Sequence, residues 1–153
     1  MKKILLYLLQ CFILTGIVIS INPCFMDAQP KDIQFKHLTI NDGLSYSWVN
    51  TITQDKFGFI WIGTDDGLNR YDGNNFRIYK NDRLDTNSIR SSTVTKIYED
   101  SRGVLWIGTT NGVSIYDRQT DRFIWDPRFS NQRISSIVED GDGSLCHQTS
   151  RRC

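Results

Sequence analysis

An internal repeat of about 45 residues restricts the fold of this chain more than any other feature of its sequence. Shifting the sequence by 45 residues aligns residues 52–72 with residues 97–117, and ten of the 21 aligned positions are identical. A third copy begins 40 residues after the second, over residues 137–145. Repetition at this period is typical of folds that stack one supersecondary unit on the next. The identical pairs are Ile52/Ile97, Asp55/Asp100, Gly58/Gly103, Trp61/Trp106, Ile62/Ile107, Gly63/Gly108, Thr64/Thr109, Gly67/Gly112, Tyr71/Tyr116 and Asp72/Asp117.

Each copy of the repeat predicts four short strands. In the second copy these are residues 94–99, 104–109, 113–117 and 122–125, and the Asn111-Gly112 pair is a strong hairpin signal. Four antiparallel strands per 40 to 45 residues are typical of a propeller blade. A β-sandwich would not repeat the same residue types at the same offsets. The sequence therefore predicts an all-β fold, a β-propeller fragment of about two and a half four-stranded blades in an incomplete ring.

The amino terminus predicts export. Lys2 and Lys3 precede an apolar run over residues 4–21, and Ala28 supplies a small residue of the kind found at cleavage sites. The run is also at the lower limit for crossing a bilayer, so residues 1–28 are either a cleaved signal peptide or an uncleaved anchor. The expected organisation after residue 28 is a segment ahead of the first blade (29–48), a blade (49–80), a connection (81–93), a second blade (94–126), the start of a third (127–145) and an aberrant tail (146–153).

Composition excludes several classes of function. The net charge is +1, so no basic excess supports nucleic-acid binding. The four cysteines lie at positions 11, 24, 146 and 153, and the two histidines at 37 and 147, far from any metal-ligand or redox spacing. We therefore expect no metal and no cofactor, and a body that folds without disulfides.

The repeated tryptophans and glycines predict how blades pack. Trp61 and Trp106 are large rings in the second strand of each copy, where we expect them to fill the space between neighbouring blades. Gly63 and Gly108 follow two residues later on the same face of the strand. There a missing side chain allows close approach of an adjacent blade.

The pattern Ile-x-x-Asp-x-x-Gly-x-x-Trp-Ile-Gly-Thr-x-x-Gly-(Leu/Val)-x-x-Tyr-Asp resembles the two-component regulator propeller repeat of periplasmic sensors in Bacteroides-type hybrid two-component systems. Residues 35–45 are similar to the segment with which those sensors begin, which implies that residues 29–48 comprise a ring-closing strand, formed by residues 35–40, and a connection. The resemblance implies a sensor on the periplasmic side of the inner membrane, which detects oligosaccharides from polysaccharide breakdown.

In that family the full-length protein carries a histidine kinase and is expected to form a homodimer. No kinase segment is recognisable in these 153 residues, so we expect no enzymatic activity from this chain. Contact with the membrane is expected only through the amino-terminal segment or through a carboxy-terminal helix that follows in longer relatives.

Four residues are candidates for ligand binding. Tyr46 and Trp48 have no aromatic counterpart in the second copy, which makes them candidates for stacking on a sugar ring, although packing would also explain them. Asp65 and Asp66 are candidate acceptors for sugar hydroxyl groups, although an Asp-Gly hairpin turn also explains them. Arg83 and Arg90 are expected to be solvated charges.

The residues disfavour two alternative functions, and a third stays open. A glycan-active enzyme needs a fixed set of carboxylates. Asp55, Asp100 and Asp140 instead recur once per blade, which favours a role in turns, and no catalytic residue is predicted. A calcium loop over residues 140–144 lacks the glutamate at its twelfth position, so a hairpin turn is favoured. A stand-alone exported binding propeller remains an open alternative.

The repeat pattern stops abruptly after Leu145. The expected Trp-Ile-Gly-Thr is replaced by residues 146–153, which show no strand alternation and no glycine. The hypothesis from this pattern is a frameshifted or prematurely ended reading frame of a longer sensor gene, whose product does not signal. Apolar blade faces and open sheet edges also predict that the chain is prone to aggregation when it is expressed alone.

Overall fold

The structure is a computed structural model that describes residues 35–140 and 145–149. The chain divides into two units, residues 1–36 and 37–153, and the fold below is that of the second unit. The predicted signal peptide or anchor (1–28) lies outside the described residues, as do residues 141–144 of the segment that superficially resembles a calcium loop. Within the described ranges, no helix is long and apolar enough to cross a membrane.

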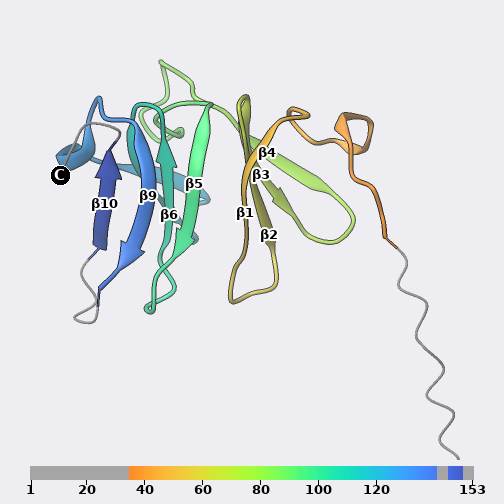
Figure 1. Ribbon diagram of the computed structural model, residues 1–153. Helices are drawn as coiled ribbons and strands as arrows, with labels where there is room; N and C mark the ends of the chain where they lie inside the picture. The colour runs from red at the N-terminus through yellow and green to blue at the C-terminus, as the bar shows by residue number, and fades with distance from the viewer. Residues whose placement is uncertain (1–34, 141–144, 150–153) are drawn as a thin grey trace, which may run out of the picture. The chain divides into compact units, whose positions relative to one another are not determined.

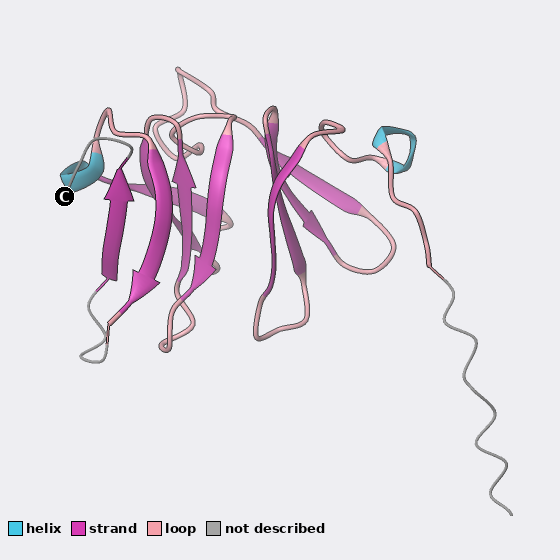
Figure 2. Ribbon diagram, viewed as in Figure 1, coloured by secondary structure: helices cyan, strands magenta, loops and turns pink. Residues whose placement is uncertain are grey.

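The second unit contains two four-stranded antiparallel sheets and a two-stranded hairpin (Figures 1 and 2). Strands pair in chain order within each four-stranded sheet, so each sheet is one blade. The prediction of an all-β propeller fragment is confirmed. The first blade comprises β1 (Val49–Gln54), β2 (Ile60–Thr64), β3 (Gly67–Tyr71) and β4 (Phe76–Tyr79); the second comprises β5 (Val94–Glu99), β6 (Leu105–Thr109), β7 (Gly112–Asp117) and β8 (Arg122–Asp126); β9 (Ile134–Glu139) and β10 (Leu145–Thr149) form the hairpin.

The turn between the first two strands of each blade is built by the repeated aspartate. The Asp55 carboxylate accepts hydrogen bonds from the backbone N–H groups of Phe57 and Phe59, both at 3.0 Å. The Gly58 N–H closes the turn on the Asp55 carbonyl, and Gly58 adopts a φ of +91°. Because that φ favours glycine over other residues, the Asp-x-x-Gly spacing specifies the turn.

A hydrophobic layer lies between successive sheets. Trp61 and Leu68 of the first blade are fully buried in one cluster with Val94, Leu105 and Ile107 of the second. A second cluster brings Trp106 and Val113 of the second blade together with Ile134 and Ile137 of β9. The same face of each blade therefore buries its tryptophan against the next sheet, and this repeated layer is the core of the molecule.

The repeated glycines lie where two sheets come closest. A Cβ atom on Gly63 would lie 2.5 Å from Val94 Cγ1, and one on Gly108 would lie 2.8 Å from Ile134 Cγ2. Val94 and Ile134 are the first residues of β5 and β9, so the contact is equivalent in the two copies. The close approach of blades depends on the missing side chain at both positions.

The ring-closing strand expected at residues 35–40 would pair with the last blade of a complete ring, which the described residues do not contain, so ring closure stays a prediction. Residues 35–39 form no strand, and Ile40–Asp42 is a 3-10 helix, η1. Thr39 caps this helix through a reciprocal pair of bonds, since its Oγ1 accepts from Asn41 N–H and its N–H donates to Asp42 Oδ2. No strand of the described residues pairs with this segment. The capping box therefore fixes the start of η1 ahead of the first blade.

The carboxy-terminal tail also differs from its expectation. Residues from Cys146 onward were expected to leave the strand pattern, but β10 continues to Thr149 and pairs antiparallel with β9. The hydrogen bonds between paired strands are made by the backbone. A segment can therefore pair with β9 even though its apolar and polar residues do not alternate. The last part of the predicted tail, residues 150–153, lies outside the described residues.

Candidate functional site

The connecting segments at one end of the strands form the candidate binding surface. We call this surface the loop face; it lies at the top of Figure 1, opposite the turn between β1 and β2. It carries the turns between the second and third strands and the connections between blades. Loops on a rigid sheet scaffold are the usual carriers of binding residues. The loop face consists of residues 41–48, 65–66, 81–92, 110–111 and 127–133.

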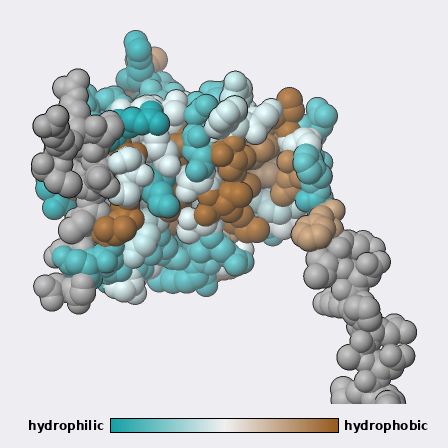
Figure 3. All heavy atoms as spheres, in the orientation of Figure 1, coloured by the Kyte–Doolittle hydropathy of each residue, from teal (hydrophilic) through white to brown (hydrophobic). Residues whose placement is uncertain are grey.

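The two aromatic candidates are exposed on the loop face. The Tyr46 side chain has an exposed fraction of 47% and Trp48 has 69%. Apolar side chains also gather on the surface over β1 and its neighbours (Figure 3), where the exposed large residues include Val49 and Ile52. Exposed aromatic rings on a fixed strand end offer flat apolar faces to a ligand.

The two aspartate candidates occupy the turn between β2 and β3. Asp65 Oδ1 accepts a hydrogen bond from Asn50 Nδ2 at 2.8 Å, and Asp66 Oδ2 pairs with Lys80 Nζ at 2.7 Å. The Asn50 contact brings Asp65 beside the start of β1, two residues after Trp48. Asp66 is instead directed to the end of the first blade's last strand. The structure thus brings Asp65 into the neighbourhood of the aromatic segment and leaves Asp66 in an ion pair.

Hydrogen bonds make the loop face continuous between the two blades. Thr93 Oγ1 donates to the Asp65 carbonyl at 3.1 Å, and the Thr93 N–H donates to Ser91 Oγ at 3.2 Å. Ser91 Oγ in turn lies 2.9 Å from Thr110 Oγ1 on the turn between β6 and β7. The turns of both blades are therefore tied to the connection between them.

A polar pocket of about 460 Å³ lies on the loop face of the second blade. It is lined by Asn81, Arg83, Arg90, Ser91, Ser92, Asn111 and Trp125. The Arg90 guanidinium lies 4.4 Å from the centre of the Trp125 ring, whose Nε1 donates to the Ser88 carbonyl at 2.6 Å. Arg90 is thus half-buried against an aromatic ring, which differs from the solvated charge expected from the sequence.

Trp125 was missed at the level of the sequence. In the second blade it pairs with Ser114, and in the first blade the equivalent pair is Asn69 with Ile78. Trp125 is therefore an aromatic residue without an aromatic counterpart in the other copy. That is the same signal that selected Tyr46 and Trp48, and applying it to the fourth strand would have found Trp125.

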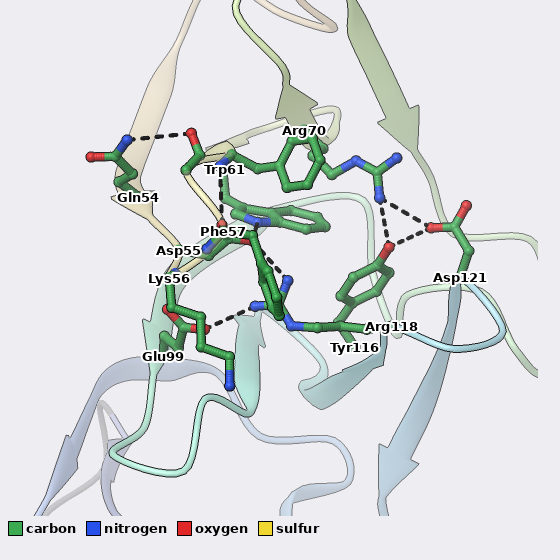
Figure 4. Close-up of polar contacts among 12 residues, drawn as sticks. Gln54, Asp55, Lys56, Phe57, Trp61, Arg70, Glu99, Tyr116, Arg118 and Asp121 are labelled. Carbon is green, nitrogen blue, oxygen red and sulfur yellow. Dashed lines mark hydrogen bonds and ion pairs between the residues drawn. The ribbon is translucent and has the colours of Figure 1, made fainter.

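The repeated aspartate of the first blade, Asp55, belongs to a polar network at the opposite end of the blade (Figure 4). Asp55 Oδ2 accepts hydrogen bonds from Trp61 Nε1 at 2.8 Å and from Arg118 Nη1 at 2.7 Å. Arg118 also bonds Glu99 Oε1 at 2.9 Å, and its guanidinium lies over the Phe57 ring. Each oxygen of Asp55 is occupied by donors from the protein itself.

These contacts set the charge state of the repeated aspartates. Burial acts to raise the pKa of Asp55, but the hydrogen bonds from Trp61 and Arg118 outweigh it and hold that pKa below its ordinary value. Burial is likewise outweighed at Asp100, whose pKa is lowered by the Val104 N–H and by Trp106. Both carboxylates are thus ionised, hydrogen-bonded within their own turns, and suited to a structural role rather than to proton transfer.

The repeat matches a known family model. The model described as two component regulator propeller matches residues 43–66 and 88–111, which are equivalent stretches of the first and second copies. Each stretch runs from the segment before the first strand to the turn after the second strand. The resemblance to the two-component regulator propeller repeat is confirmed.

Relatives place this repeat in sensor proteins. Histidine kinase P4 from Formosa agariphila is 50% identical over 64 residues, which is 42% of this chain and 5% of that protein. The extracellular domain of a protein assigned as the hybrid two component system BT3049 from B. thetaiotaomicron aligns with a TM-score of 0.63 and 29% identity, over 73% of this chain and 17% of that chain. The extracellular domain of BT4673 from the same organism, assigned as a one component system, aligns with a TM-score of 0.60 and 27% identity, over 76% and 18%.

This chain spans about a twentieth of the curated relative and less than a fifth of either solved domain. The solved structures that it matches are extracellular propeller domains, not catalytic domains.

Proposed function

We propose that this chain, which carries two-component regulator propeller repeats, is a ligand-sensing propeller segment of a hybrid two-component system on the periplasmic side of the inner membrane. One observation carries the proposal. Nearly three quarters of the chain aligns at 29% identity and a TM-score of 0.63 with the extracellular domain of a protein assigned to such a system. The proposed ligand is an oligosaccharide released by polysaccharide breakdown.

The loop face supports a sugar as the ligand. Tyr46 and Trp48 offer exposed rings, and the flat apolar face of a pyranose stacks on such rings. Asp65 lies nearby and retains one carboxylate oxygen outside its hydrogen bond with Asn50. Carboxylates accept hydrogen bonds from hydroxyl groups at short distance, and these bonds are stronger than neutral ones. Rings for stacking and an acceptor for hydroxyls together suit a carbohydrate.

A sensor must convert binding into a change of state. A ligand shifts a conformational equilibrium only by its difference in affinity for the two states. We propose that the oligosaccharide is bound at the loop face of a propeller within a homodimer of the longer protein, and that it favours one arrangement of the pair.

The proposal is tested by binding measurements with the full chain. Isothermal titration calorimetry against a panel of di- to octasaccharides is expected to find at least one ligand, and Trp48→Ala is expected to weaken it by about tenfold through lost stacking. Phe57→Ala is the matched control, because Phe57 is exposed on the turn at the other end of the blade. Equal weakening by both substitutions, or binding that is unchanged in Trp48→Ala, would contradict the assigned surface.

A further inference from the structure

The pocket on the second blade carries positive charge without an acidic partner. Two of its seven lining residues are arginines, and none is Asp or Glu. Neither Arg83 nor Arg90 forms an ion pair within residues 35–140, whereas five other arginines there pair with carboxylates. Clustered positive charge in a concave surface raises the local concentration of anions. The five paired arginines are Arg70, Arg77, Arg102, Arg118 and Arg128.

Arg90 is held in a fixed position in this pocket. Its guanidinium stacks on the Trp125 ring at 4.4 Å, and its backbone N–H donates to Ser114 Oγ at 3.0 Å. The ring is itself anchored through the bond from Trp125 Nε1 to the Ser88 carbonyl. The guanidinium N–H groups make no hydrogen bond to another described residue. A stacked guanidinium with free N–H groups is organised in advance to bind a planar or tetrahedral oxyanion through two hydrogen bonds.

The blade fold does not require this pair of residues. Ser45 holds the position of Arg90 in the first blade, since its N–H donates to Asn69 in the same way that the Arg90 N–H donates to Ser114. Ile78 holds the position of Trp125. The first blade forms the same four-stranded sheet with a serine and an isoleucine. The four-stranded sheet therefore does not depend on the Arg90–Trp125 pair.

We infer that this pocket binds an anionic sugar, one that bears a carboxylate or a sulfate group. This inference rests on the proposed function, because it names the class of oligosaccharide that the loop face takes. Arg90 and Arg83 bind the anionic group, and Asn111, which lines the same pocket, binds a ring hydroxyl. The Asn81 amide instead donates to the Ile89 and Arg90 carbonyls and holds the connection in place. The bonds through Ser91 and Thr93 connect the pocket to the surface around Asp65.

The test uses the full chain and pairs of glycans that differ only in charge. Oligogalacturonates are compared with their methyl esters, and sulfated galactan oligosaccharides with their desulfated counterparts. The charged member of at least one pair is expected to bind at least about tenfold more tightly than its neutral counterpart, since hydrogen bonds to charged groups are stronger than those between neutral groups. The pair that shows the difference identifies the anion as a carboxylate or as a sulfate.

Substitutions connect this difference to the pocket. Arg90→Gln and Arg83→Gln are each expected to weaken the charged glycan by about tenfold, and Arg90→Lys to restore only part of the affinity because it lacks the planar fork. Arg133→Gln is the matched control, because Arg133 is an exposed arginine of the loop face that does not line the pocket.

The outcomes separate this inference from the proposed function. Charged and neutral glycans that bind equally, or affinity that is unchanged in both glutamine variants, would overturn the inference and leave the sensor proposal standing. Absence of binding to every glycan tested would overturn both. If Arg90→Gln loses its circular dichroism signal, Arg83→Gln decides, because Arg83 is exposed and its substitution leaves the Trp125 contact in place.

Discussion

A single missing side chain sets the distance between neighbouring blades. Gly63 in β2 faces the first residue of the next blade, and Gly108 in β6 does the same one repeat later. Cores of this kind are close-packed, so an added methyl group forces neighbours to move. The glycine after each repeated tryptophan is thus a packing residue, and its place in the sequence follows from the contact between sheets.

Gly63→Ala is expected to lower the free energy of unfolding by about 1–3 kcal/mol, the usual cost of adding a methyl group to a full core. The new Cβ atom would lie 2.5 Å from Val94 Cγ1 and 2.7 Å from Thr51 Cγ2. Urea denaturation followed by tryptophan fluorescence measures the change.

A double-mutant cycle separates this clash from other effects of the methyl group. Val94→Ala removes the nearer obstacle, so Gly63→Ala is expected to cost less in that background than in the wild type. A cost that is the same in both backgrounds would show that Val94 does not restrict this position.

At the scale of the strand and its turn, one interaction recurs between successive blades. The last residue of β5, Glu99, accepts a hydrogen bond from the Lys56 N–H in the first blade's turn at 2.8 Å. The last residue of β9, Glu139, accepts one from the Ser101 N–H in the second blade's turn at 2.9 Å. Each first strand thus caps the turn of the blade before it. Arg118, from the turn between β7 and β8, adds an ion pair to Asp55 in the first case.

The stability of the pair of blades is expected to fall in acid because of Asp55. Its pKa is lowered in the folded state from an ordinary value of 3.8, so ionised Asp55 stabilises the fold above that pH. This contribution is lost as the pH falls below 3.8 and through the lowered pKa. The difference in free energy of unfolding between wild type and Asp55→Asn is therefore expected to be largest near pH 7 and to shrink below pH 3.8.

Urea denaturation of both proteins at a series of pH values measures this difference. Asp65→Asn, which removes an exposed carboxylate from the same blade, is the control for general charge effects. A gap between wild type and Asp55→Asn that is constant down to pH 2.5 would show that Asp55 does not make this contribution.

The sequence could predict those elements whose structure depends on residues close together in the chain. The Asp-x-x-Gly and Asn-Gly turns and the alternating strands gave β5 to β8 nearly to the residue. The strand expected before the first blade came only from the family resemblance, and the Thr39 capping box that starts η1 was not recognised from the sequence. The Arg90–Trp125 stack joins residues 35 positions apart, so no local spacing indicates it. Contacts between blades are non-local, and only the repeat itself gave an indication of them.

At the scale of the whole molecule, one repeat position shows how the blades depend on each other. Ile97 in the second blade and Ile137 in β9 are 2% and 4% exposed, and each lies in a core cluster with the tryptophan of the preceding blade. Ile52, the same position in the first blade, is 63% exposed. Among the described residues no blade precedes it. The same residue type is thus buried in the core in the second and third copies and exposed in the first.

Substitution at this position is expected to destabilise the second blade strongly and the first blade hardly at all. Ile97→Ala should lower the free energy of unfolding by about 2–5 kcal/mol, as large-to-small changes in a core do. Ile52→Ala should change it by less than about 0.5 kcal/mol, since exposed substitutions rarely do more. Urea denaturation of the two variants of the full chain measures both effects. Similar losses in the two variants would show that the face of the first blade is covered in solution.

The hydrogen bonds between blades have a consequence for how the sequence of such a chain can evolve. Asn50 Nδ2 donates to the Val94 carbonyl, and Thr95 Oγ1, at the equivalent position, donates to the Ile134 carbonyl. A side-chain amide and a side-chain hydroxyl therefore make equivalent hydrogen bonds between blades, because the acceptor is a backbone carbonyl in both cases. The repeat copies can therefore diverge in sequence while the hydrogen bonds between neighbouring blades keep the same register. Connections of different length, such as residues 80–93 and 127–133, are then compatible with the same contact between blades. A lineage is thus able to acquire new ligand preferences at the ends of its strands without rebuilding the scaffold beneath them.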